Sequence, residues 1–240
     1  MINNFNFPVG VEWSLNYTSG PDFFSDDFKF SDAVKLFYHN QGSVVKYLDT
    51  SNVTNMNSMF SNCDKLVTIP QLDTSKVTNM SYIFYYCGNL LIIPQLDTSN
   101  VTNMDSMFYY CRNLTTIPQL DTSKVTNMSS MFSGCSNLNS IPLLDCGKVT
   151  SVSTMFGWED INTLTDLGGF KNLKINFTNG LNHLPNLTVQ SLMNVINNLY
   201  DFRANGSTTT TKTLQLGTTN LNKLTDEQKA VAVNKGWSLT

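Results

Sequence analysis

The chain repeats one 24-residue unit, and Leu48–Gln71, LDTSNVTNMNSMFSNCDKLVTIPQ, shows that unit in full. Leu72–Gln95 reads LDTSKVTNMSYIFYYCGNLLIIPQ. Leu96–Gln119 and Leu120–Leu143 follow the same pattern, and a fifth, decaying copy begins at Leu144. Thirteen of the 24 positions are identical in the four good copies. A repeat of this kind predicts one small unit per copy, which buries its apolar side only by stacking on neighbouring copies.

The apolar positions divide each copy into two predicted segments. From Val53 to Cys63 they recur at steps of three and four residues, which predicts a helical or 3-10 turn segment. Leu66–Ile69 is short and β-friendly, and Pro70 ends it, so we expect a short strand there. Stacked copies place equal positions about 4.8 Å apart. The expected interior ladders are Phe60/Phe84/Phe108/Phe132/Phe156, Cys63/Cys87/Cys111/Cys135, Leu66/Leu90/Leu114/Leu138 and Ile69/Ile93/Ile117/Ile141.

The repeat resembles a known family. Phe132–Pro142, FSGCSNLNSIP, is similar to the F-x-x-C-x-x-L-x-x-I-P core of BspA-like leucine-rich repeats. The preceding LDTSxVTNMxxMF is similar to the variant found in bacterial surface proteins and phage-encoded proteins, and the likeness covers Leu48–Phe156. The resemblance implies a leucine-rich-repeat-like α/β solenoid, with short parallel strands and helical or 3-10 turn segments, used for adhesion or recognition without catalysis. Binding residues of that family are not fixed motif positions, so the resemblance assigns no site.

The ends of the chain differ from the repeats. Residues 1–47 are expected to form an N-terminal cap or attachment segment, 48–156 the five repeats, and 157–240 irregular C-terminal repeats and a cap, because a solenoid must cover its terminal coils. The C-terminal part predicts an amphipathic helix capped by Thr188, a strand at Thr213–Leu216, a helix at Asp226–Asn234 opened by a capping box, and a last strand at Trp237–Leu239.

Composition narrows the function classes. Charged residues are 14% of the chain, against roughly 25% in typical soluble proteins. The net charge of −3 and the scattered Lys and Arg residues argue against nucleic-acid binding. No segment has the run of about 18 apolar residues expected of a transmembrane helix, so membrane insertion is not expected. Residues 1–8, MINNFNFP, do not resemble a signal peptide.

Three groups of residues could carry chemistry, and each also has a structural explanation. Four cysteines recur every 24 residues and Cys146 follows them, without the close pairing of zinc ligands, so a reduced buried ladder is favoured over a metal site. The recurrent aspartates at Asp49 and its equivalents suit turn capping better than calcium binding, although calcium is left open. His39 and His183 are the only histidines, and no catalytic motif or acid/base pair is present. We therefore expect no enzyme, no cofactor and no catalytic or metal-binding residue.

Tyrosines supply the candidate binding surface. Two Tyr-Tyr pairs follow the ladder phenylalanines of the second and third copies, at positions that are Ser, Asn or Gly in the first and fourth copies. The repeat does not require tyrosine there, so variation is free to serve recognition, for which exposed aromatic side chains are favoured. Packing of the protein's own loops against these rings is an equal alternative. The candidate residues are Tyr82, Tyr85, Tyr86, Tyr109 and Tyr110.

Two functional hypotheses follow. The first is a virion component of a phage, such as a fibre, tail or capsid-decoration protein with a host-binding role; the second is a bacterial cell-surface adhesin. The lack of a signal peptide favours the virion surface over the cell surface or the extracellular space, because phage proteins are released by lysis. The expected partners are a protein or glycan on a host surface, or other virion proteins, and a homo-oligomer is left open.

Overall fold

The computed structural model describes residue 37 and residues 48–159, 161–178, 180–208 and 211–240. The expected cap or attachment segment, 1–47, lies outside the described residues except for Phe37. The Phe37 ring stacks on that of Phe60 with centroids 5.2 Å apart, and the Phe37 N–H donates to the Met59 carbonyl. Phe37 thus extends the phenylalanine ladder by one step.

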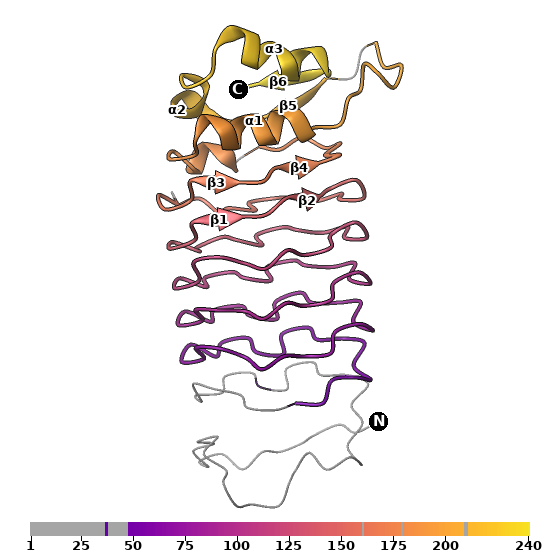
Figure 1. Cartoon of the computed structure of the whole chain (residues 1–240), viewed down its shortest axis with the longest axis vertical. Helices are drawn as coiled ribbons and strands as arrows, with labels where there is room; N and C mark the ends of the chain where they lie inside the picture. Colours follow the sequence, from indigo (N-terminus) through magenta and orange to yellow (C-terminus); the bar gives the residue numbers. More distant parts are fainter. Residues whose placement is uncertain (1–36, 38–47, 160, 179, 209–210) are drawn as a thin grey trace, which may run out of the picture.

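Each 24-residue copy forms one coil, and the coils are stacked one on another (Figure 1). We number them from coil 1, residues 48–71, to coil 5, which begins at Leu144. One side of the stack, which we call the asparagine face, carries parallel bridges joining Asn55, Asn79, Asn103, Asn127 and Ser151. The opposite side, the front face, carries parallel bridges from Thr68 to Ile92 and from Thr116 to Ser140. Bridges between equal positions of successive copies fix the coils in register.

The expected helical or 3-10 segments are wrong for this part of the chain. Residues 48–159 contain no helix; overlapping turns take its place. In coil 1 the Met59 N–H donates to the Met56 carbonyl at 3.2 Å, and the Cys63 N–H donates to the Phe60 carbonyl at 3.2 Å. Ser58 and Asn62 between them have φ of +56° and +60°. These left-handed residues stop the chain from winding into a helix.

Instead, the backbone of each coil runs nearly straight along the asparagine face. Every second N–H group of this segment points to the next coil. The Met56 N–H donates to the Asn79 carbonyl and the Ser58 N–H to the Ser81 carbonyl, each at 2.9 Å. Apolar residues spaced by three and four positions fit this extended segment as well as a helix, because both structures bury every third or fourth side chain. Periodicity alone does not separate the two.

The core consists of the expected ladders. The phenylalanine, cysteine, leucine and isoleucine positions are all buried in coils 1–4. Neighbouring rings from Phe60 to Phe156 stack with centroids 5.7–5.9 Å apart. The cysteines are free thiols, and those of coils 2–4 each donate to the carbonyl of the preceding coil's phenylalanine, as Cys111 does to Phe84 at 3.1 Å. The cysteine ladder is therefore a structural feature of the core.

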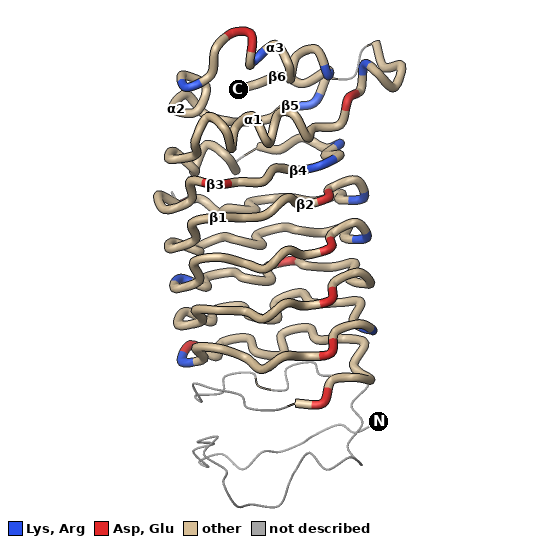
Figure 2. The backbone as a smooth tube through the Cα atoms, viewed as in Figure 1, with Lys and Arg blue, Asp and Glu red and all other residues tan. Residues whose placement is uncertain are grey.

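The aspartates line one edge of the stack (Figure 2). In each of the first four coils an Asp Oδ1 accepts the N–H two residues later, as Asp73 does from Ser75 at 3.0 Å, and Asp145 accepts from Gly147. The Ser75 hydroxyl donates to the same oxygen at 2.7 Å and holds the pKa of Asp73 below its ordinary value. These carboxylates cap turns, where helix starts were expected.

On the front face the stack continues past coil 5 through parallel strand pairs. β1 (Ser140–Ile141) pairs with β3 (Asp166–Leu167), and β2 (Leu144–Asp145) pairs with β4 (Phe170–Lys171). Ser140 pairs with Asp166, 26 residues on, whereas Thr116 pairs with Ser140, 24 residues on. Since Asn127 still pairs with Ser151, the two extra residues lie between Ser151 and Asp166.

The C-terminal part is helical as well as stranded. Its elements are η1 (Leu181–His183), α1 (Val189–Asn198), β5 (Lys212–Leu214), α2 (Gly217–Leu221), α3 (Asp226–Asn234) and β6 (Trp237–Leu239), with β5 and β6 parallel. Thr188 caps α1 by accepting the Ser191 N–H, and Thr225 and Gln228 form the capping box of α3. Both expected caps are confirmed, because side-chain caps depend on local sequence.

Candidate functional site: a tyrosine surface on the asparagine face

All five candidate tyrosines lie together on coils 2 and 3. Tyr85 and Tyr86 follow the buried Phe84, and Tyr109 and Tyr110 follow the buried Phe108, so equal positions of two coils meet. Each ring is partly exposed, and Tyr86 is the most open at 40%. We call Tyr82, Tyr85, Tyr86, Tyr109 and Tyr110 the tyrosine surface.

The rings form two stacked pairs. Tyr85 and Tyr109 lie 4.8 Å apart at 12° between ring planes, and Tyr86 and Tyr110 lie 4.9 Å apart at 12°. Within coil 2, the rings of Tyr85 and Tyr86 meet edge to face at 4.7 Å. Each such aromatic contact adds about 0.5–1.5 kcal/mol beyond the area it buries. The cluster is therefore preorganised, and a partner need not order these side chains on binding.

The backbone under this surface does not favour tyrosine. Tyr82, Tyr86 and Tyr110 have φ of +59°, +58° and +57°. The position of Tyr86 and Tyr110 is Asn62 in coil 1 and Gly134 in coil 4, and both residue types suit that conformation. For other residues a left-handed conformation costs about 1–2 kcal/mol. Tyrosine occupies this position twice despite that cost, which points to a role for the side chain.

Neighbouring residues fix Tyr110. A Cβ on Gly134 would lie 2.7 Å from Tyr110 Cδ2, so the ring packs against the glycine. The Arg112 guanidinium lies 4.9 Å from the centroid of the Tyr110 ring, within cation–π range. The chain itself therefore covers part of Tyr110, as the loop-packing alternative expects, while Tyr86 remains open.

The hydroxyl groups of Tyr82 and Tyr109 are donors at neutral pH. A hydrogen bond to the Asp105 carboxylate raises the pKa of Tyr82 above its ordinary value of 10.0, and burial raises the pKa of Tyr109. Since paired rings cover each other's faces, the surface offers mainly ring edges and hydroxyl groups to a ligand. Such a surface suits the flat, hydrogen-bonding contacts of a protein interface better than stacking on a sugar.

Other ligand chemistries find no support in the described residues. No group of three or more His, Cys, Asp or Glu side chains is placed there to hold a metal ion. Burial raises the pKa of the Cys135 thiol to about 12, which makes it a poor nucleophile at neutral pH. In this part of the chain, no helix combines the length and the apolar character needed to cross a bilayer.

Three of the exposed apolar residues that lie on the coils were not identified from the sequence. Leu91 and Ile92 of coil 2 are 44% and 67% exposed on the front face, and Trp158 is 67% exposed in the segment of coil 5 between Ser151 and Asp166. The sequence does indicate that two of them are exposed. The equivalents of Leu91 and Ile92 in coil 3 are Thr115 and Thr116, so the repeat does not need apolar side chains at these positions. Trp158 follows the last ladder phenylalanine, where the period breaks.

A model of one protein family matches most of the repeat region. Described as "Mycoplasma protein of unknown function, DUF285", it matches residues 28–91 and again 89–164. The chain belongs to this family. Comparison with curated proteins and with solved structures gives no match. Membership in the DUF285 family thus places the chain among repeat proteins without assigning it an activity.

Proposed function

We propose that this DUF285 protein is a non-enzymatic recognition protein that binds a partner protein through the tyrosine surface. The observation that carries the proposal is the placement of Tyr86 and Tyr110 at left-handed positions where Asn62 and Gly134 stand in other coils. Neither tyrosine is needed to form the coil. Tyrosine is enriched at interfaces, and preformed clusters of it bind at low entropic cost.

The wider assignment is to a leucine-rich-repeat solenoid of the BspA-like type. The 24-residue bridges between coils and the matched family both support it. Solenoids present extended surfaces that suit recognition. We propose that the protein acts on the outside of a virion, with the bacterial cell surface as the alternative location. The low content of charged residues fits either place.

The chain supplies its own matched variant for the binding test. Tyr85→Ser, Tyr86→Asn, Tyr109→Ser and Tyr110→Gly together give coils 2 and 3 the residues that coils 1 and 4 carry at these positions. The control variant, Leu91→Thr with Ile92→Thr, removes exposed apolar side chains from the front face and copies coil 3. Both variants keep every ladder residue.

Wild type and both variants are then screened on arrays of cell-surface proteins, virion proteins and glycans. The proposal expects a protein ligand that wild type and control bind and that the tyrosine variant has lost. It is wrong if the tyrosine variant keeps all binding, or if only glycans bind. Mass spectrometry of gradient-banded virions against bacterial envelopes separates the two locations.

A further inference from the structure

The hydrogen-bond ladder of the asparagine face stops at coil 5. In the preceding coils, several series of N–H groups donate to carbonyls of the next coil, and two of these series end with Met128 to Ser151 at 3.0 Å and Ser130 to Ser153 at 2.9 Å. The equivalent donors of coil 5 are the N–H groups of Val152 and Thr154. Neither has a hydrogen-bond partner among the described residues.

An acceptor is left over on the same row. The Thr126 carbonyl accepts the Thr150 N–H at 2.8 Å, and the same bond joins each earlier pair of coils. The Thr150 carbonyl accepts no hydrogen bond from a described residue. Coil 5 therefore presents one acceptor and two donors at alternate positions, and every earlier coil uses these same three groups among those that bind its neighbour.

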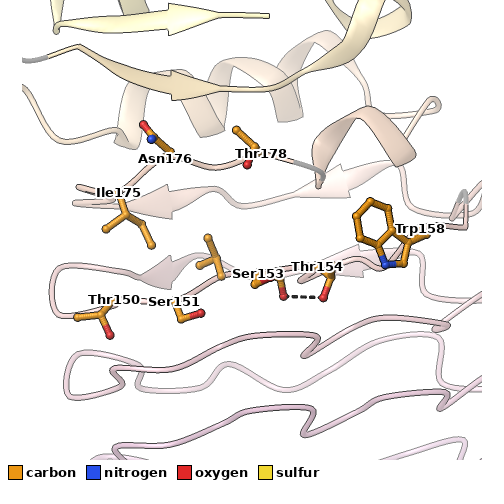
Figure 3. A pocket seen from close by; sticks show the side chains of 9 residues that line it. Thr150, Ser151, Ser153, Thr154, Trp158, Ile175, Asn176 and Thr178 are labelled. Carbon is orange, nitrogen blue, oxygen red and sulfur yellow. Dashed lines mark hydrogen bonds between the residues drawn. The ribbon is translucent and has the colours of Figure 1, made fainter.

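The segment that follows coil 5 on this face, residues 175–178, pairs with β5 and not with coil 5. The Phe177 N–H donates to the Thr213 carbonyl at 2.8 Å, and the Gln215 N–H donates to the Phe177 carbonyl at 2.9 Å, so residues 175–178 pair toward β5. Figure 3 shows this row above that of coil 5, with a pocket between them. On the front face the same two levels stay paired through β2–β4. The stack is thus open on one face only.

The resulting groove has a volume of about 370 Å³ and no charged side chain in its lining. Its polar side chains are hydroxyls and one amide, and its apolar members are Val152, Ile175 and Trp158, with Trp158 to one side (Figure 3). The Oγ atom of Ser153 and the Nδ2 atom of Asn176 make no hydrogen bond to a described residue. Trp158, 67% exposed, offers an open aromatic ring.

The stacked peptide groups also polarise the open row. The series that end at Met128 and Ser130 link peptide groups head to tail from coil 1 to coil 5, with their N–H groups pointing toward coil 5, whereas the threonine series points the opposite way. Aligned peptide dipoles leave partial positive charge at their N–H end, as they do in a helix. The groove therefore needs acceptor oxygens at alternate positions and one donor, which an extended polypeptide supplies.

We propose that this groove, between residues 150–154 and 175–178, binds an extended peptide segment of a partner protein by strand addition. Two peptide carbonyls accept from the N–H groups of Val152 and Thr154, and a peptide N–H donates to the Thr150 carbonyl. An uncharged apolar side chain of the segment packs on Trp158. The groove is separate from the tyrosine surface.

The test uses the full chain and a random peptide library displayed on phage. Selected peptides are made synthetically and titrated against the chain while backbone amide exchange is followed by NMR. We expect binding to slow exchange of Val152 and Thr154, with Met128 and Ser130 already protected in the free protein. Trp158→Ala should weaken binding about tenfold or more, the effect of removing an aromatic anchor. The Leu91→Thr, Ile92→Thr control should bind as wild type does.

Three results overturn the proposal: selection enriches no peptide, bound peptides leave the exchange of Val152 and Thr154 unchanged, or a glycan from an array is the ligand that protects these amides. Because the tyrosine quadruple variant keeps the groove, it should bind the same peptides. That comparison separates failure of the groove from failure of the tyrosine surface.

Discussion

Tyr86 combines an exposed ring with a backbone conformation that tyrosine rarely adopts. Substitutions there separate the backbone from the side chain. Tyr86→Ala and Tyr86→Gly both remove the ring, but only glycine adopts a φ of +58° without strain. We expect the glycine variant to have a free energy of unfolding about 1 kcal/mol higher than the alanine variant. Chemical denaturation of the two proteins measures the difference, and equal stabilities would contradict the left-handed assignment.

The buried thiols predict a dependence of stability on pH. Burial raises the pKa of Cys135 and Cys146 from the ordinary 9.0 to about 12, and it also raises the pKa of Cys87 and Cys111 well above 9.0. As pH rises, the unfolded chain loses these protons before the folded protein does. The contribution of the thiols to the free energy of unfolding is therefore complete below pH 9 and falls as pH rises from about 9 to 12. The expected loss is about 1.4 kcal/mol per pH unit for each thiol.

Urea unfolding at a series of pH values from 8 upward tests this slope. Cys135→Ala removes one titrating group and should lower the slope by one thiol's share. A variant with the wild-type slope would show that Cys135 titrates normally in the folded protein.

At the scale of elements, the caps of the C-terminal helices form between residues close in sequence, whereas each coil is held by hydrogen bonds to the neighbouring coils. Thr225→Ala removes the acceptor of the Gln228 N–H at the start of α3. We expect the free energy of unfolding to fall by about 1 kcal/mol, the usual effect of losing a cap. Thr225→Ser keeps the hydroxyl and should stay within a few tenths of wild type. Denaturation of both variants checks the cap, and equal losses would contradict it.

The same contrast explains what the sequence predicts well. Repeat length, the ladder residues, the limits of α3 and β6 and both helix caps follow from periodicity or from a few neighbouring residues. The turns of the asparagine face cannot be predicted in this way. Ser58 and Asn62 adopt left-handed backbones because carbonyls of the next coil accept their N–H groups. The grouping of the five tyrosines was predictable from their equal positions. The groove was not, because it depends on where residues 175–178 pair after the insertion.

At the scale of the whole molecule, each coil contacts mainly its two neighbours, so a central defect should divide the stack. Phe108 lies between Phe84 and Phe132, 5.8 Å from each. Phe108→Ala should lower the free energy of unfolding by about 3–5 kcal/mol, the range for large buried aromatic residues. Native-state hydrogen exchange should show coils 1 and 2 opening at lower free energy than α1 and β6. A uniform loss of protection would contradict stacking by nearest neighbours.

The measurement that tests the recognition surface most directly is tyrosine footprinting in the protein's native setting. Tyrosines are nitrated on intact virions or cells and on the purified chain, and the modified sites are mapped by mass spectrometry with Tyr200 as the reference. The account predicts that Tyr86 is nitrated readily in the purified chain and protected, relative to Tyr200, in the native setting. Equal nitration of Tyr86 in both preparations would contradict a tyrosine surface that binds a partner.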